Sequence, residues 1–207
     1  IAGQNDFDYG SRSATSRGSD GNAPGIAIDS SLLGGMYAGR ISILATEAGS
    51  GVNMQGQMAA NAGEMTLTAD GRLVMGQVQA RGPLRATSQS STVRAERTIF
   101  SDEAITLQGL TAVEIAENTL VASQSDVALV GSNFSLETGA IVAAGVTSSG
   151  AQTTSGSLTL SGTAIDAGEG TLVAGARIAL EAATVDLSRE NAATADTVRS
   201  LGDVDIT

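Results

Sequence analysis

The feature that most constrains the fold of this chain is a short strand-like motif that returns at a nearly fixed interval. The motif is a triplet in which two apolar residues flank a small or polar one, the period-2 pattern of a strand with one buried face. Its copies begin at Ile41, Met65, Leu84, Ile105, Val127, Leu158 and Ile178. A sustained period of this kind is typical of a solenoid and not of a domain with one central core.

Two further sets of strand-like segments repeat with the same period as the first. One set begins at Val52, Leu73, Val93, Val113, Phe134, Ile165 and Val185. The other begins at Met58, Val78, Ile99, Leu120, Ile141 and Leu172. Three sets at one period predict three strands in each rung of about 20–21 residues, every strand pairing with its counterpart one rung away. We therefore predict an all-β fold, a right-handed parallel β-helix of about eight rungs and about 40 Å in length.

One interval in the third set is longer than the rest. Successive members differ by 20, 21, 21, 21 and 31 residues, and the excess falls between Ile141 and Leu158. Residues 144–157, where we place the insertion, are rich in Ser, Thr and Gly. This composition predicts a loop or small hairpin that protrudes from one corner, and we expect it to be dispensable for folding.

The two ends of the chain differ from its middle. Residues 1–9 alternate weakly and are interpreted as a strand, whereas residues 10–25 have the Ser, Gly and Asp content of an exposed loop. Within that loop, Arg12 and Arg17 are expected only to be solvated. A strand-like alternation resumes at residues 26–28.

Near the other end, the strand pattern is expected to continue to Leu187. Asn191 to Thr197 are expected to form a loop or a single helical turn. Residues 204–207 again read as a strand. We interpret residues 32–207 as one continuous solenoid.

Composition argues against several functional classes. The 207 residues include 26 Gly but neither Cys nor His, and all 11 cationic side chains are Arg. A net charge of −11 argues against nucleic-acid binding, which depends on neutralising phosphates. No apolar run approaches the roughly 18 residues of a membrane-spanning helix. The hydrophobic content of 42% argues against disorder. Because no signal peptide is recognisable, we interpret the chain as an internal fragment or a processed product.

A family motif lies near the start of the repeats. It reads Gly34-Gly35-Met36-Tyr37-Ala38-Gly39-Arg40-Ile41, then Thr46-Glu47-Ala48-Gly49-Ser50-Gly51-Val52, then Gly56-Gln57-Met58-Ala59-Ala60. On these residues the chain closely resembles the filamentous haemagglutinin family, the large exoproteins of two-partner secretion, which include contact-dependent growth inhibition toxins of Gram-negative bacteria. Residues 34–82 carry the motif, and beyond residue 82 only the repeat period matches. Residues 1–31 resemble the end of the family's amino-terminal secretion domain.

The resemblance implies a right-handed β-helix that is exported through an outer-membrane partner transporter. It implies a stalk or adhesin at the bacterial surface, secreted as a monomeric rod, that contacts a host or bacterial surface receptor in adhesion or contact-dependent toxin delivery. In the family, the secretion signal and the transporter-recognition motifs would lie before Ile1. A toxin, where one is carried, would lie far beyond Thr207.

An enzyme is the main alternative, because some parallel β-helices are polysaccharide lyases or hydrolases. Their sites need grouped carboxylates with a cationic residue on the same face. The best cluster in this chain comprises Asp102, Glu103, Glu114 and Glu117 with Arg94 and Arg97. Arg94 and Glu114 are 20 residues apart, so we expect them to form an ion pair between rungs. A solvated ion pair on a sheet face is the interpretation that we favour.

Other chemistries find weaker support in the sequence. Calcium would require acidic turns such as Asp20-Gly21-Asn22 or Asp166-Ala167-Gly168-Glu169-Gly170, but the repeated nonapeptide of calcium-binding β-rolls does not occur. Gly34-Gly35 and Gly49-Ser50-Gly51 lack the spacing of a phosphate-binding loop, and corner geometry explains them better. A conventional nucleophilic triad is excluded because the chain has no His and no Cys.

These observations favour a non-catalytic β-helical segment of a secreted surface exoprotein. We predict no catalytic residues, no cofactor and no metal site. A fragment of a carbohydrate-active β-helix enzyme is the first alternative, and a generic autotransporter-like passenger is the second. An acidic groove that also contains Arg and crosses three or more rungs would favour the enzyme.

Overall fold

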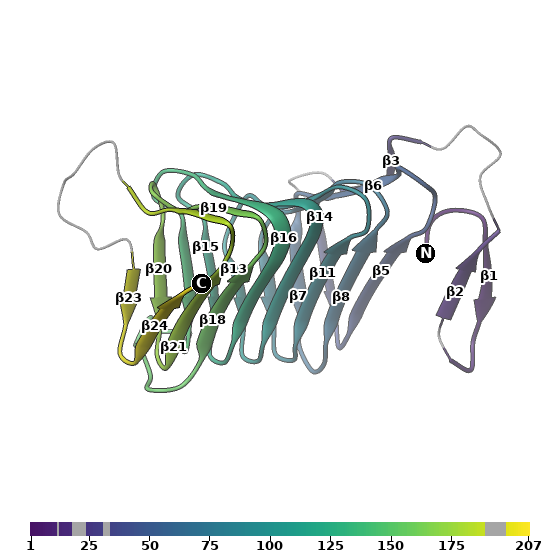
Figure 1. Ribbon diagram of the computed structural model, residues 1–207. Coiled ribbons are helices and arrows are strands. Elements are labelled where there is room, and N and C mark those ends of the chain that lie inside the picture. The colour runs from purple at the N-terminus through teal and green to yellow at the C-terminus, as the bar shows by residue number, and fades with distance from the viewer. Residues whose placement is uncertain (12, 18–23, 31–33, 189–197) are drawn as a thin grey trace.

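A computed structural model of the protein describes residues 1–11, 13–17, 24–30, 34–188 and 198–207. All regular structure in these residues is β, and none of it is helical. Figure 1 shows parallel strands stacked into an elongated solenoid, with a separate hairpin near the amino terminus. Its longest series of equivalent strands has eight members, in agreement with the predicted β-solenoid of about eight rungs with three strands in each.

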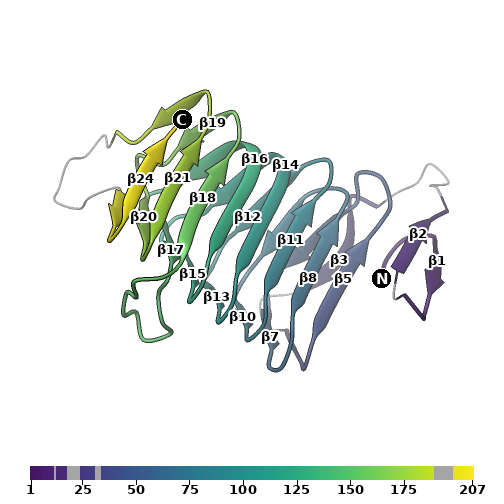
Figure 2. The same ribbon diagram turned by 60° about the horizontal axis from the view of Figure 1, so that its bottom comes forward.

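The strands form three faces around one thin core (Figures 1 and 2). The first face contains β5 (Ile41–Ala45), β8 (Met65–Ala69), β11 (Leu84–Ser88), β14 (Ile105–Ile115), β16 (Val127–Leu136), β18 (Ser157–Ser161), β21 (Arg177–Glu181) and β24 (Asp203–Ile206). The second contains β3 (Ile26–Ser30), β6 (Gly51–Met54), β9 (Leu73–Met75), β12 (Thr92–Ala95), the second halves of β14 and β16, β19 (Ala164–Asp166) and β22 (Thr184–Asp186). The third contains β4 (Gly35–Ala38), β7 (Gln57–Ala60), β10 (Val78–Ala80), β13 (Ile99–Ser101), β15 (Leu120–Ser123), β17 (Ile141–Ala144), β20 (Thr171–Ala174) and β23 (Val198–Ser200).

The strand register confirms two of the three predicted sets. On the first face the aligned residues are Ile41, Met65, Leu84, Ile105, Val127, Leu158 and Ile178. On the second face they are Val52, Leu73, Val93, Val113, Phe134, Ile165 and Val185. Leu107, Leu129 and Leu160 align in a fully buried column. Apolar side chains at equivalent positions thus form one continuous core.

On the third face the predicted register is wrong by one residue in two rungs. The spacing in the sequence aligns Ile99 with Leu120 and Ile141, but Ile99 pairs with Val121, which pairs with Val142. Val121 and Val142 are fully buried, whereas Ile141 is 37% exposed. Each of these two strands begins with two adjacent apolar residues, so the sequence pattern alone fits either phase.

The corner that precedes each of these strands decides the phase. Five residues lie between buried Ile115 and buried Val121, whereas only three lie between Ala95 and Ile99 in the preceding rung. The longer corners contain Asn118 at a φ of 54° or its counterpart Gly139 at a φ of 74°. Such left-handed residues turn the chain tightly, and Asn and Gly tolerate them best.

The amino-terminal region is more ordered than its composition predicts. β1 (Asn5–Asp8) confirms the expected strand, but the expected loop also contains β2 (Ser13–Ser16), which pairs antiparallel with β1. The carboxylate of Asp8 accepts hydrogen bonds from the N–H groups of Gly10 (2.7 Å) and Ser11 (3.2 Å) and so closes the hairpin turn. This polar hairpin lacks the apolar alternation by which strands are usually recognised.

Arg17 is not simply solvated, because its Nε lies 3.2 Å from a carboxylate oxygen of Asp6. Arg12 lies outside the described residues. The predicted strand at residues 26–28 is confirmed as part of β3, which pairs in parallel with β6 on the second face. The assignment of residues 1–31 to the end of a secretion-type domain stays a prediction.

The predicted insertion lies between β17 and β18 and projects from the solenoid (Figure 2). It is a small hairpin-like loop with one antiparallel bridge between Val146 and Gln152. Gly145 (φ 70°) and Gly156 (φ 94°) face each other at its base, and a Cβ on Gly156 would lie 2.3 Å from the backbone nitrogen of Gly145. The loop therefore leaves and re-enters the rung at nearly one point.

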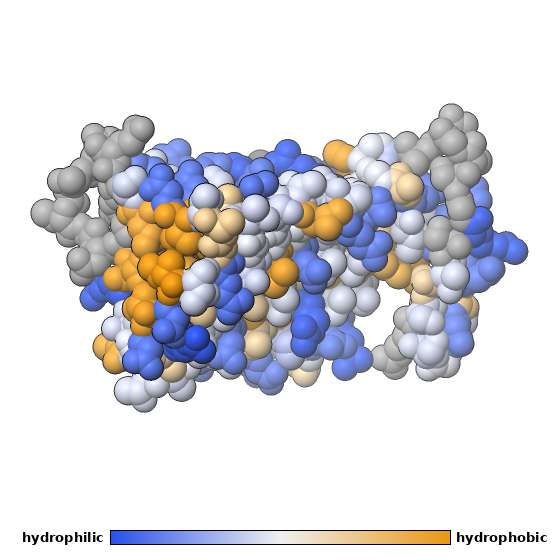
Figure 3. Space-filling view, in the orientation of Figure 1, coloured by the Kyte–Doolittle hydropathy of each residue, from blue (hydrophilic) through white to orange (hydrophobic). Residues whose placement is uncertain are grey.

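The last rung is less complete than the interior ones. β22 and β24 confirm the strand pattern near residue 187 and in residues 204–207, while residues 191–197 lie outside the described residues. Val204 aligns with fully buried Ile178, yet it is 45% exposed. Figure 3 shows hydrophobic surface at this end of the stack, where β24 lies. Within the described ranges, no helix has the length and hydrophobicity that a membrane crossing requires.

Candidate functional site

The strongest charged cluster predicted from the sequence lies on the outer side of the second face. Arg94 sits between buried Val93 and Ala95 on β12, so the pleat directs its side chain outward. Glu114 is its direct counterpart on β14. The predicted ion pair is confirmed, because Nη1 of Arg94 lies 3.2 Å from Oε2 of Glu114.

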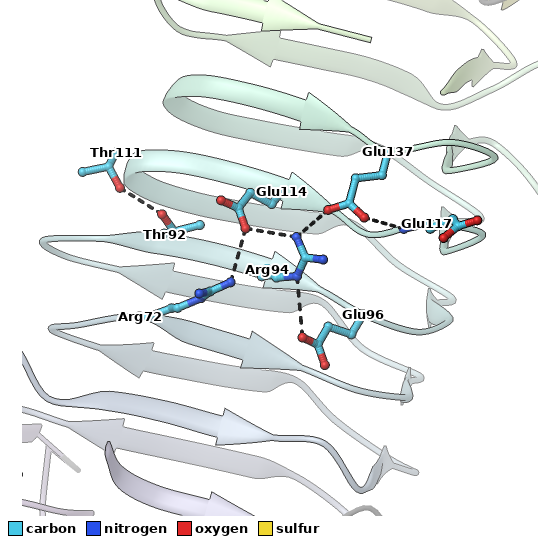
Figure 4. A network of polar contacts seen from close by, with 8 residues as sticks. All are labelled: Arg72, Thr92, Arg94, Glu96, Thr111, Glu114, Glu117 and Glu137. Atoms are coloured by element: carbon cyan, nitrogen blue, oxygen red, sulfur yellow. Dashed lines mark hydrogen bonds and ion pairs between the residues drawn. The ribbon is translucent and has the colours of Figure 1, made fainter. Parts of the chain in front are cut away.

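Three further residues complete an ion-pair network around Arg94 (Figure 4). Nη1 of Arg94 donates a hydrogen bond of 2.7 Å to Oε1 of Glu137, and its Nε lies 3.6 Å from Oε1 of Glu96. Arg72 joins from the neighbouring rung, with its Nη2 3.4 Å from Oε2 of Glu114. The side chain of Arg94 is only 20% exposed, the lowest exposed fraction in the network. Arg94 is therefore its centre.

The network shifts the ionisation of its central pair toward the charged forms. The hydrogen bond from Arg94 holds the pKa of the Glu137 carboxyl below its ordinary value; partial burial opposes this shift, and the N–H group of Glu117, 3.0 Å away, supports it. The hydrogen bond to Glu137 raises the pKa of Arg94, again against partial burial. A general acid needs the opposite shift, a carboxyl whose pKa is raised toward neutrality. These interactions therefore favour the ionised form of the Glu137 carboxyl.

The other residues of the predicted cluster do not join this network through their side chains. Asp102 accepts a hydrogen bond of 2.7 Å from Gln124, and the main-chain carbonyl of Glu103 accepts one of 2.6 Å from Ser123. Glu117 contributes only its N–H group. Arg97 lines a polar hollow that borders the third face, which Tyr37 also lines and Arg94 does not.

Sequence reasoning missed Arg72, Glu96 and Glu137. Glu96 could have been found, because it lies two residues after Arg94 and the period-2 pattern places it on the same face. Glu137 lies just beyond the end of β16, and Arg72 lies just before β9. Long side chains at strand ends reach diagonally across rungs, and a search restricted to direct counterparts does not find them.

The other predicted alternatives are placed as follows. Asp166 lies on β19 next to Asp186, whose carboxylate accepts hydrogen bonds from the N–H group and the hydroxyl of Ser188. Asp20 to Asn22 lie outside the described residues. In the described part of the chain, Asp and Glu side chains form no cluster of three or more that could hold a metal ion. Gly49 has a φ of 75° at the corner between β5 and β6.

Comparison with known proteins finds similarity to very large toxins. The chain is 51% identical over 75 residues to the tRNA nuclease CdiA-2 of Burkholderia pseudomallei, a match that covers 36% of this chain and 2% of the relative. It is 39% identical over 90 residues to Toxin CdiA of Yersinia pestis, which covers 42% of this chain and 3% of that protein. A third relative, the 16S rRNA endonuclease CdiA of Enterobacter cloacae, is 31% identical over 106 residues, 51% of this chain and 3% of the relative.

No protein-family model and no solved structure matches the chain. The matched segments span only about 2–3% of the length of these curated relatives. Even so, their names and the β-solenoid agree with the resemblance carried by residues 34–82. The homologues of this chain are CdiA contact-dependent inhibition proteins of the two-partner secretion family, and the chain shares the β-solenoid expected of haemagglutinin-like repeats.

Proposed function

We propose that this chain is a non-catalytic stalk or adhesin segment of a large surface exoprotein that acts in adhesion or contact-dependent toxin delivery. The parent protein is exported through an outer-membrane partner transporter and displayed at the Gram-negative cell surface, where this segment forms part of a monomeric rod. The observation that carries the proposal is the single core that runs beneath all three faces from rung to rung. Such a core makes a stiff rod whose length grows with the number of rungs.

The charged side chains support the same role. Arg94 pairs with Glu114 one rung away and with Glu137 two rungs away, and Arg72 pairs with Glu114 two rungs away, so the network holds several rungs together along the second face. The nuclease activities named for the relatives belong to proteins of which the matched segments are a few per cent. We place any toxin activity of the parent protein outside this segment.

A carbohydrate-active enzyme remains the second candidate, on one observation. Arg and Glu side chains of the network follow one face across successive rungs, beside a hollow of about 280 Å³ that is lined by Arg72 and Glu96. The lowered pKa of Glu137 argues against a general acid at this place.

Degradation assays distinguish the two candidates. The purified protein is incubated with acidic and neutral polysaccharides, with and without calcium, and new reducing or unsaturated ends are measured. We expect no cleavage under any of these conditions. Cleavage that disappears in Arg94→Ala or Glu114→Gln would contradict the stalk and establish the enzyme. Binding of the fluorescently labelled protein to bacterial or host cells then separates an adhesin, which binds, from a pure spacer, which does not.

A further inference from the structure

The outer side of the third face carries a groove that the ion-pair network does not use. One part is a polar hollow of about 290 Å³ lined by Tyr37, Gln57, Gln77 and Arg97. The other part, of about 440 Å³, lies between the same face and the insertion, with Gln77, Gln79 and Phe100 along its wall and residues 146–150 of the loop opposite. Because Gln77 lines both parts, we treat them as one surface and call it the glutamine groove.

The polar side chains of the glutamine groove keep free hydrogen-bonding capacity. Tyr37 donates a hydrogen bond of 2.8 Å to the side-chain carbonyl of Gln57, which leaves the amide NH₂ group of Gln57 available. Gln77, Gln79 and Arg97 are exposed, and their side chains make no hydrogen bond or ion pair to any residue that the structure describes. Each amide offers a donor and an acceptor a fixed distance apart.

An apolar floor adjoins these amides. Phe100 lies between buried Ile99 and Ser101 on β13, so its half-exposed ring points out of the sheet into the groove. Leu120 and Ala122 continue the floor on β15. A hollow with apolar surface and a few directed polar groups is the usual make-up of a small-molecule binding site. An aromatic ring adds a large contact area with little loss of side-chain freedom.

The groove follows the repeat of the solenoid. Its lining comes from β4, β7, β10, β13 and β15, five consecutive strands of the third face and the corners before them. At a spacing of about 4.8 Å between strands, this series spans about 19 Å. Similar groups recur along that length, since Gln57 and Gln77 occupy equivalent positions immediately before or at the start of successive strands. A linear ligand with a repeating unit fits such a surface better than a compact one.

We propose that the glutamine groove binds a linear oligosaccharide. An amide that both donates and accepts matches the paired hydroxyl groups of a sugar, each of which also donates and accepts, and the ring of Phe100 matches the apolar face of a sugar ring. A polyanion is a poor ligand because Arg97 is the one cationic residue among the described residues that line the groove, in a chain of net charge −11. Arg97 can hold a single carboxylate of the oligosaccharide. This inference rests on the adhesive role proposed above and gives it a ligand class.

The loop completes the groove from its open side. Val146, Thr147 and Ser149 come from the insertion and face the β10 to β15 surface across the hollow. Thr147 and Ser149 hydrogen-bond to each other through their hydroxyls at 2.9 Å, and Ala151 N–H also donates to Thr147. These contacts fix the loop hairpin, and the N–H group of Val146 attaches its base to β15 through a hydrogen bond of 2.8 Å to the carbonyl of Ser123.

The test uses the purified protein on an array of bacterial and host glycans, followed by calorimetry with the glycans that bind. The double variant Gln77→Ala/Gln79→Ala should weaken binding at least about tenfold, since it removes two amides. Phe100→Ala should weaken it as well. Gln108→Ala is the matched control, because Gln108 is an exposed amide on β14 of the first face, outside the groove. The Gln108→Ala variant should bind the glycan with the affinity of the wild type. Thermal unfolding of every variant verifies that the solenoid is intact.

Three outcomes would contradict the proposal that the glutamine groove binds an oligosaccharide. They are an array with no bound glycan, a glycan whose affinity is the same in the double variant and the wild type, and preferential binding of extended peptides from a library tested in parallel. Cell-binding assays separate this failure from failure of the adhesive role. If cells bind the double variant as well as they bind the wild type, the adhesive role is supported and the groove is not its binding site. Glycan binding without cell binding would support the groove and contradict the adhesive role.

Discussion

The outer sides of the second and third faces lie over the same core but use their polar side chains in opposite ways. On the second face, Arg94 pairs with Glu96, Glu114 and Glu137, so the charge of this Arg is neutralised within the protein. On the third face, Gln77 and Arg97 find no side-chain partner among the described residues. Side chains that satisfy each other hold rungs together, whereas side chains left unsatisfied are available to a ligand. The contrast separates a structural surface from a binding surface.

The largest expected effect lies beneath both surfaces. Leu129→Ala should lower the free energy of unfolding by about 2–5 kcal/mol, because it removes a fully buried side chain from a column in which Leu107 and Leu160 pack on either side. Chemical denaturation measures the change. Leu110→Ala is the control, since Leu110 is 60% exposed and its loss should change stability by less than about 0.5 kcal/mol. Equal stability of both variants would contradict the prediction that Leu129 contributes to the core.

Removing the centre of the ion-pair network should have the next largest effect. Arg94→Ala should cost about 1–2 kcal/mol at neutral pH, because it leaves three carboxylates without their shared cation on a partly exposed surface. Arg85→Ala serves as the comparison, since Arg85 is exposed and has no ion pair with a described residue. If the two variants unfold at the same denaturant concentration, the second face is not held together by its charges.

The same network predicts a dependence on pH. The pKa of Glu137 is lower in the folded protein than its unfolded value of about 4.3, so its contribution to stability is complete above that value and is lost as the pH falls through the folded pKa. The cost of Arg94→Ala should therefore be greater at about pH 7 than at about pH 3. Denaturation of both proteins at the two pH values measures this, and Leu129→Ala, whose cost should be independent of pH, is the control. A constant cost for Arg94→Ala would rule out the charge pair as its source.

The smallest effect on stability is expected for the insertion. Deleting residues 146–155 and joining Gly145 directly to Gly156 should change the free energy of unfolding by less than about 1 kcal/mol, because the two glycines already lie against each other. The deletion removes two hydrogen bonds to neighbouring strands, from the Gln152 side chain to the carbonyl of Ala174 and from the N–H group of Val146 to the carbonyl of Ser123, but no core residue. Circular dichroism should keep its β signal and a cooperative transition. Loss of the β signal or of the cooperative transition would show that the loop is needed for folding. A deletion variant that stays folded but no longer binds glycan would show that the loop serves the binding surface of the third face and not stability.

The sequence by itself determined the solenoid, because stacking places equivalent residues of successive rungs on one another and so forces the apolar positions to repeat. Leu107, Leu129 and Leu160 could be assigned to one buried column from their spacing alone. The position of the insertion followed from the same arithmetic. The pair Arg94 and Glu114 was predictable for this reason too, since direct counterparts one rung apart must lie side by side.

Only the tertiary structure decided what local pattern leaves open. The burial of Val121 and Val142 instead of their apolar neighbours depends on a longer corner turned by Asn118 or Gly139, whose conformation a period-2 pattern does not encode. Glu137 reaches Arg94 diagonally from beyond a strand end, and Arg97 lines the same hollow as Tyr37, 60 residues earlier in the chain. Long flexible side chains choose partners by distance in space, and sequence period fixes only the backbone from which they extend.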